Sequence, residues 1–115
     1  MNDFGFASAS TVVRDEKVIE LLKLVAKAVS EKEYIMYGNI KLVNVCMAGQ
    51  QIIRWKVKGY NVLDMQIETL NDGSVIVKIE GLFSNMNEAQ EYVKKFIEIM
   101  EDIAINMIVE GVDNG

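Results

Sequence analysis

The carboxylates of Asp64 and Glu80 are the residues whose types and spacing come nearest to a chemical site. The sequence Asn-Asp-Gly over residues 71–73 predicts a three-residue hairpin loop, in which the glycine adopts the positive φ that closes the turn. Such a loop pairs Leu70 with Ser74, and counting back along both strands then puts Asp64 directly opposite Glu80. The sequence therefore predicts two acidic side chains side by side on one face of an antiparallel sheet.

This acidic pair has a catalytic and a structural interpretation. Opposed carboxylates repel each other, and a divalent cation such as Mg²⁺ would relieve the repulsion, as in a metal-dependent phosphodiesterase. Either Arg54 or Lys56 is also expected to reach Asp64 from the strand on its other side, which offsets the repulsion without a metal. Mixed charges are the usual covering of a sheet face in water. We therefore expect a solvated surface that holds neither a metal nor a cofactor.

The composition excludes most other catalytic machinery. The chain has no histidine and one cysteine, which excludes Ser-His-Asp and Cys-His mechanisms and a structural zinc site within one chain. Its glycines match neither the phosphate-binding loop G-x-x-x-x-G-K-[ST] nor the dinucleotide fingerprint G-x-G-x-x-G. The sequence therefore favours a protein that is not an enzyme.

Basic residues on the same predicted sheet face suggest an alternative function. We call them the basic strip: Arg54, Lys56, Lys58 and Lys78. Such a strip would suit a nucleic-acid-binding accessory or regulatory protein, because Lys and Arg side chains contact the phosphate backbone. The acidic residues nearby and the formal net charge of −5 oppose this function.

The strands that position these side chains form an antiparallel meander over residues 50–82. Alternating apolar residues predict its inner face, and Trp55 is expected to point from this face into the core rather than to serve as a stacking platform. For Ile53 and Trp55 to share a face with Leu63 and Met65, the first turn must have an odd number of residues.

The segments around the meander complete a two-layer α+β sandwich. A helix is predicted from Thr11 or Asp15 to Glu33, and a further strand over residues 40–47. Whether residues 34–37 form a separate strand stays open, because the Gly-Asn pair that follows also suits a tight hairpin. The predicted fold has an N-terminal helix, a meander of three to four strands, or five if residues 34–37 form one, and a long C-terminal helix, with both helices on one sheet face.

The C-terminal helix is predicted from the cap Asn85 to Glu110, with Gly111 ending it. Its last three turns are apolar almost all round, so one sheet face is not expected to cover it. We therefore expect a homodimer through this helix, although an intradomain core helix is the alternative. The predicted interface residues are Phe96, Met100, Ile103, Met107 and Ile108.

The remaining features concern the compartment and the N-terminus. Residues 1–10 are expected to form a flexible tail ahead of a single domain over residues 11–115, with docking of the tail as the alternative. Cys46 is expected to be a small buried side chain in a reducing compartment. The chain shows neither a secretory signal nor an apolar run of about 20 residues. We expect a small cytoplasmic interaction or accessory protein that acts without a membrane, and a protein partner beside the homodimer stays an open alternative.

Overall fold

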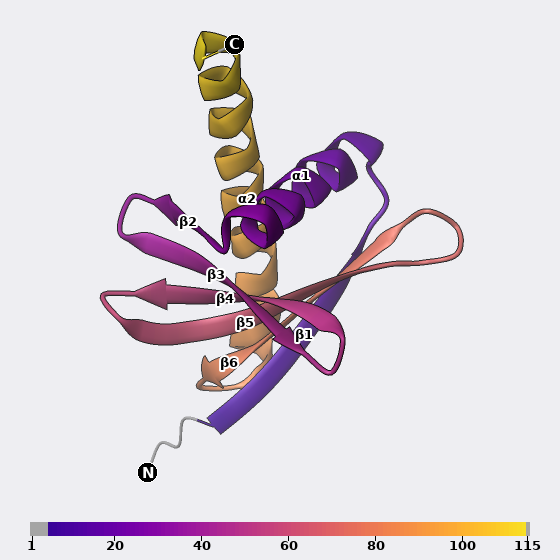
Figure 1. Ribbon diagram of the computed structural model, residues 1–115. Coiled ribbons are helices and arrows are strands. Elements are labelled where there is room, and N and C mark those ends of the chain that lie inside the picture. Colours follow the sequence, from indigo (N-terminus) through magenta and orange to yellow (C-terminus); the bar gives the residue numbers. More distant parts are fainter. Residues whose placement is uncertain (1–4, 115) are drawn as a thin grey trace.

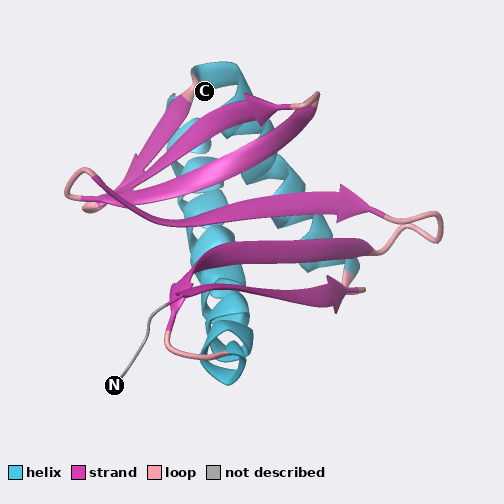
Figure 2. Ribbon diagram, turned by 90° about the horizontal axis from the view of Figure 1, so that it is seen from below, coloured by secondary structure: helices cyan, strands magenta, loops and turns pink. Residues whose placement is uncertain are grey.

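The computed structural model describes residues 5–114, which form one open six-stranded sheet and two helices. The elements in chain order are β1 (Gly5–Val13), α1 (Glu16–Lys32), β2 (Tyr34–Tyr37), β3 (Ile40–Met47), β4 (Gln50–Val57), β5 (Tyr60–Thr69), β6 (Val75–Phe83) and α2 (Met86–Asn114). The strand order across the sheet is β1-β6-β5-β4-β3-β2, with every neighbouring pair antiparallel. Both helices lie against the same face, so the predicted two-layer α+β fold is confirmed, with more strands than predicted (Figures 1 and 2).

The core lies between this face of the sheet and the helices. Side chains along β6 alternate between buried and accessible positions, as expected for a strand with one covered face. Trp55 is 1% exposed and meets the ring of Phe96 from α2 edge-to-face, with the ring centroids 4.8 Å apart. The predicted core position of Trp55 is therefore confirmed.

The hairpin between β5 and β6 has the predicted register. Leu70 N–H donates to the carbonyl of Ser74 at 2.8 Å, and Gly73 has a φ of 90°. Asp64 accordingly lies opposite Glu80, and the core residue Met65 lies opposite Ile79.

The first turn of the meander differs from the prediction. Val57 pairs with Tyr60, so the loop has two residues and not an odd number. The register then shifts between Trp55 and Lys56, and one extra residue on β5 brings Trp55 opposite Leu63. A β-bulge therefore restores the common apolar face that the sequence pattern demanded.

The bulge explains why a glycine occupies position 81. Gly81 lies opposite Leu63, and a Cβ built on it would lie 2.8 Å from the carbonyl oxygen of Val62. A glycine inside a strand often marks such a close backbone approach.

The N-terminal segment is not a flexible tail as far as the structure describes it. Residues 5–13 form β1, which pairs with β6 over nine consecutive residues, from Gly5 with Phe83 to Val13 with Val75. Thr11 therefore belongs to a strand, and the helix starts after Asp15, whose carboxylate accepts from Lys17 N–H at 2.9 Å. The predicted tail residue Phe4 lies outside the described residues. Residues 34–37 form the separate strand β2.

The C-terminal helix has the predicted start but not the predicted end. Glu88 N–H donates to the side-chain oxygen of Asn85 at 2.9 Å, and the Glu88 carboxylate accepts from both the backbone N–H and the hydroxyl of Ser84. The helix continues through Gly111 to Asn114. A glycine inside a helix is tolerated at about 1 kcal/mol relative to alanine, so Gly111 alone does not end the helix.

We expect Gly81→Ala to lower the free energy of unfolding by roughly 1–3 kcal/mol, because the new methyl group must displace backbone at the bulge. Urea denaturation of the wild type and the variant measures the difference. Glu80→Ala changes the exposed neighbour and should stay within about 0.5 kcal/mol. Equal stability of Gly81→Ala and wild type would contradict the close approach.

We expect the stabilisation that Glu88 contributes to be lost in acid. The hydrogen bonds from Ser84 lower the pKa of this carboxyl below its ordinary value of 4.5. A lowered folded-state pKa means that the stabilisation is present above the unfolded-state pKa and is lost as the pH falls through the folded-state value. The loss of unfolding free energy on acidification should therefore be smaller in Glu88→Gln than in wild type. Glu91→Gln, on the same helix, is the control, and identical pH profiles for wild type and Glu88→Gln would refute the expectation.

Candidate functional site

An ion pair occupies the centre of the open sheet face. The Arg54 guanidinium donates from Nε to Asp64 Oδ1 at 2.9 Å and from Nη2 to Asp64 Oδ2 at 3.1 Å. Both side chains are about one-third exposed, at 31% and 29%. Hydrogen bonding to Asp64 raises the pKa of Arg54 above its ordinary value. Arg54, rather than Lys56, is thus the cation that reaches Asp64.

This arrangement leaves little for a metal to bind. Both oxygens of Asp64 already accept hydrogen bonds from Arg54, which offsets the repulsion from Glu80 across the strand. Among the residues that the structure describes, no group of three or more His, Cys, Asp or Glu side chains is placed to hold a metal ion. What the geometry offers here is a charge-balanced sheet surface.

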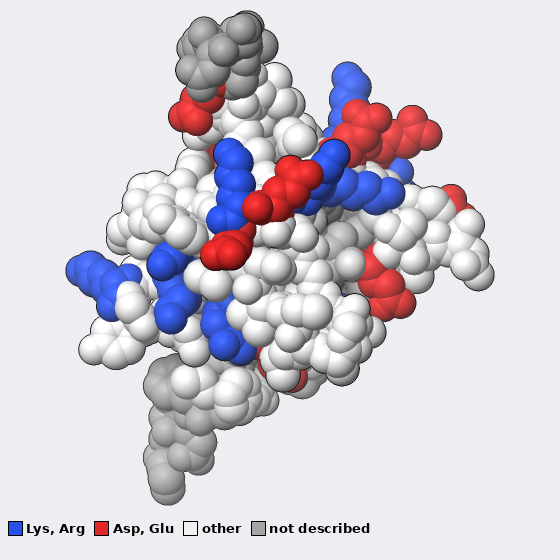
Figure 3. All heavy atoms as spheres, in the orientation of Figure 1, with Lys and Arg blue, Asp and Glu red and all other residues white. Residues whose placement is uncertain are grey.

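Two of the four residues of the basic strip lie beside acidic side chains. Arg54 is engaged by Asp64, and the Lys78 amine lies 3.9 Å from the carboxylate of Glu68. Lys56 instead faces Lys41, its cross-strand partner on β3. Figure 3 shows Lys and Arg side chains together on the side where the β4–β5 turn lies.

Lys41 was missed by the sequence analysis. The signal is the two-residue Ala48-Gly49 turn, which sets the pairing of β3 with β4 and thereby places Lys41 opposite Lys56. The Lys41 amine also lies 4.5 Å from the centroid of the Tyr34 ring. Binding of nucleic acid by this side of the sheet stays a prediction.

The predicted interface residues of the C-terminal helix separate into two groups. Met100 is fully buried and Ile103 is 2% exposed, so both belong to the core of one chain. Phe96 is half-buried against Trp55, and Met107 is half-buried at the edge of the core. Ile108 alone of the five is exposed.

The exposed apolar surface of α2 lies on its other side. We call Ile105, Ile108 and Val109 the α2 patch; their exposed fractions are 48%, 48% and 55%. An α-helix turns about 100° per residue, which places the three on one side of the helix, away from the core residue Ile103. The last turns of α2 extend beyond α1 and the sheet (Figure 1), and all three side chains of the patch are about half exposed.

The charged residues in the C-terminal half of α2 are all acidic. After Lys95 the sequence contains no Lys or Arg, and its acidic residues are Glu98, Glu101, Asp102, Glu110 and Asp113. Acidic groups near a helix C-terminus oppose the helix dipole, so this end of α2 has a negative potential from both sources.

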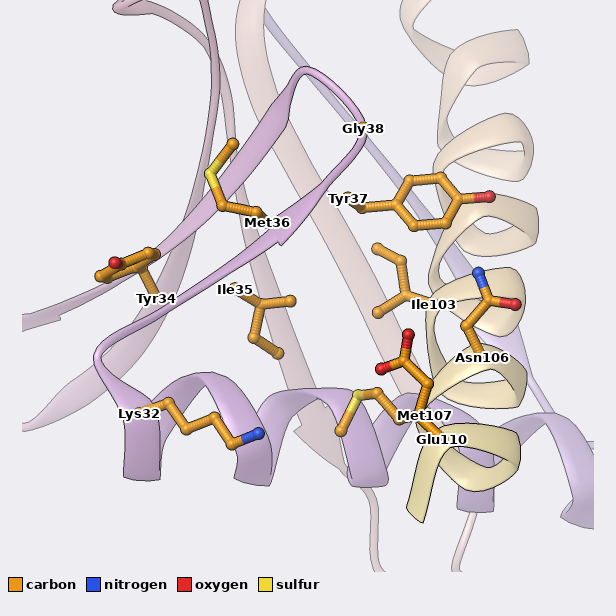
Figure 4. A pocket seen from close by; sticks show the side chains of 10 residues that line it. All are labelled: Lys32, Tyr34, Ile35, Met36, Tyr37, Gly38, Ile103, Asn106, Met107 and Glu110. Atoms are coloured by element: carbon orange, nitrogen blue, oxygen red, sulfur yellow. The ribbon is translucent and has the colours of Figure 1, made fainter. Parts of the chain in front are cut away.

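A groove of about 490 Å³ lies between β2, the end of α1 and the C-terminal half of α2 (Figure 4). Ile35 and Tyr37 point into it from β2, whereas Tyr34 and Met36 point away. Ile103 and Met107 form the wall of the groove on α2. The Tyr37 hydroxyl donates a hydrogen bond to Asp102 Oδ2 on the same helix at 3.4 Å. The polar rim of the groove consists of Lys32, Asn106 and Glu110.

The groove has the chemistry of a binding surface. Its lining contains no Ser, Thr, Cys or His side chain. Its volume falls in the range of small-molecule sites, and its apolar walls with a few polar groups suit an apolar side chain or a small amphipathic molecule.

Cys46 is exposed, contrary to the prediction. Along β3, Leu42 is buried, Asn44 is half-buried and Cys46 is exposed, because the strand runs out from under the helices toward the Ala48-Gly49 turn.

No known protein family, curated protein or solved structure matches this chain. Within the described residues, neither helix combines the length and the apolar character needed to span a membrane.

We expect Arg54→Gln to lower the free energy of unfolding by about 1 kcal/mol, the upper end of the range for exposed ion pairs, because the lost contact is bidentate. Chemical denaturation measures the change. Lys78→Gln, which removes a cation with one long contact on the same face, is the control and should have a smaller effect. Equal effects of the two substitutions would contradict the central role of the Arg54 pair.

Proposed function

We propose that this protein is a non-enzymatic interaction or accessory protein that binds a protein partner through the α2 patch. The observation that carries the proposal is the end of α2, where three apolar side chains project from the domain. A partner that covers this surface presents apolar side chains flanked by Lys or Arg, in a helix packed along α2.

The spacing of the α2 patch suits contact with another helix. Ile105, Ile108 and Val109 are spaced by three and four residues, which is the pattern by which one helix packs against another. Single exposed apolar residues are normal on a protein surface, whereas a cluster surrounded by polar residues is typical of an interaction site. About half of the surface of each side chain is open to solvent. Covering it removes apolar area from water, which supplies the driving force for binding.

The acidic residues around the α2 patch favour a basic partner. Two copies of α2 that meet through this patch bring their acidic residues together without any Lys or Arg from this half of the helix. A basic partner turns the same charges into attraction, and such complementarity contributes specificity and a faster association. The geometry therefore favours a basic amphipathic helix over a second copy of α2.

We expect a synthetic amphipathic helix of leucine and lysine to bind the wild-type protein, with an affinity that falls as the salt concentration rises. Ile108→Glu should weaken this binding at least tenfold, because the new carboxylate lies within the contact. Isothermal titration calorimetry or fluorescence anisotropy of the labelled peptide measures the affinity.

The matched control is Met86→Glu, which introduces the same charge at another exposed apolar residue of α2. This variant should bind as wild type does. A leucine–lysine peptide of the same composition without an apolar face should not bind. Equal binding by Ile108→Glu and Met86→Glu would contradict the proposal. A wild-type dimer that Ile108→Glu dissociates would instead assign the patch to a second copy of the chain, as the sequence analysis expected.

A further inference from the structure

The open edge of β1 is a second interaction surface, at the other end of α2. We propose that β1 pairs in antiparallel fashion with β1 of a second copy of this chain, which joins two sheets into one across a two-fold axis. This inference is independent of the proposed function, because it uses different residues.

Alternate residues of β1 direct their backbone groups out of the sheet. In an antiparallel pair, alternate residues direct their N–H and C=O groups to one neighbour. The Leu70 to Ser74 hydrogen bond makes the even-numbered residues of β6 face β5, so its odd-numbered residues face β1. The register of β1 with β6 pairs odd with odd, as in Ala9 with Ile79. The even-numbered residues of β1 therefore direct their backbone groups outward: Phe6, Ser8, Ser10 and Val12.

A hydrogen bond from α2 agrees with this assignment. The side-chain amide of Gln90 donates to the carbonyl oxygen of Ser10 at 3.0 Å. That contact reaches the carbonyl from the helix side of the sheet. A carbonyl oxygen has two lone pairs, so Ser10 can accept from Gln90 and from a neighbouring strand at the same time.

β1 lacks the features that usually stop an edge strand from pairing with another chain. Edge strands usually avoid pairing with other chains by being short or by carrying charges, prolines or bulges. β2, at the opposite edge, has four residues, whereas β1 pairs with β6 over nine consecutive residues. Its sequence GFASASTVV contains no charged residue and no proline. Of the two edges, β1 is thus the one that accepts another strand.

The absence of charged residues on β1 favours a second copy of the chain as the occupant of this edge. A chain with a net charge of −5 repels its own copies, so copies meet most readily where charge is absent, and β1 is such a place. A two-fold axis at Ala9 uses every outward backbone group of both strands. It sets Phe6 opposite Val12 of the second copy, and Ser8 opposite Ser10 of the second copy. Phe6 is 80% exposed and Val12 is 39% exposed, so this register covers apolar surface.

The position of β1 leaves the α2 patch accessible. α2 begins beside the β1 edge and crosses behind the sheet toward β2, so the edge and the patch lie at opposite ends of the helix (Figure 2). The two contacts can therefore be tested separately.

The test combines two substitutions and measures mass by light scattering as a function of protein concentration. Ser8→Pro removes an outward N–H that the β1–β6 ladder does not use, and proline is tolerated at such edge positions. Ile108→Glu removes the patch contact. We expect wild type and Ile108→Glu to be dimers at high concentration, and both Ser8→Pro and the double variant to be monomers with melting temperatures near that of wild type. Ser8→Lys places a charge at the same edge and should give the same result if Ser8→Pro disturbs folding.

Cross-linking tests the register. In a Cys46→Ser background, cysteines at Ser8 and Ser10 would face each other across the axis at a separation that permits disulfides. Oxidation should therefore produce covalent dimers. Cysteines at Lys78 and Glu80 have the same spacing on the same sheet face but lie on the inner strand β6, and they should remain monomeric.

Three results would overturn the inference. If neither Ser8→Pro nor Ser8→Lys lowers the mass of the dimer, β1 does not form the contact. If Ile108→Glu is monomeric, the two copies associate through α2. That result would also contradict the proposal that the α2 patch binds a basic helix of a partner. A wild-type protein that stays monomeric at high concentration excludes a second copy as the occupant of the edge. Loss of leucine–lysine peptide binding alone affects only the proposed function.

Discussion

The hydrogen bond between Leu70 and Ser74 determines the arrangement on which the rest of the sheet depends. It closes the Asn-Asp-Gly loop and thereby sets which residues of β5 and β6 face the helices. The same alternation passes through β6 to β1, where it decides which backbone groups lie at the open edge. A shift of one residue at this hairpin would turn the side chains of one strand to the other face, exposing Met65 and burying Asp64 if β5 moves, a change that burial of unpaired charge strongly opposes. One loop of three residues therefore constrains both the core and the open face.

The sequence predicted this hairpin well because two independent signals agree there. Turn residues and apolar alternation both specify the same register, and Trp55 follows into the core. At the first turn only the alternation of apolar and polar residues was informative. It predicted correctly that the apolar residues of β4 and β5 share a face, but it did not predict the two-residue loop and the bulge beside it. β1 was missed for a related reason. Small residues make up much of β1, and Ala9 is the one buried side chain among residues 6–13. The pairing with β6 therefore leaves little trace in the hydropathy of the sequence.

The long C-terminal helix shows the limit of periodicity as a guide to function. Apolar residues spaced by three and four produce the same stripe whether a helix lies on its own sheet or on a second chain. Met100 and Ile103 followed that stripe and lie in the core, whereas the residues that remain exposed lie on the opposite side of the helix. Distinguishing the two requires the position of the helix relative to the sheet. The same holds for Cys46 and Lys41, whose surroundings depend on where the strand leaves the cover of α1 and on its partner in β4.

The two proposed contacts have a geometrical consequence when they are taken together. Pairing through β1 places both sets of helices on the same face of a continuous sheet, because the two-fold axis stands perpendicular to that face. α2 runs away from the β1 edge, so the two patches then lie at the far ends of the assembly (Figure 2). Each patch can hold its own basic helix, and a partner that carries two such helices with a linker of sufficient reach gains avidity without any new contact. Self-association through the uncharged edge and partner binding through the acidic helix end are therefore compatible, since each uses a surface that the other leaves exposed.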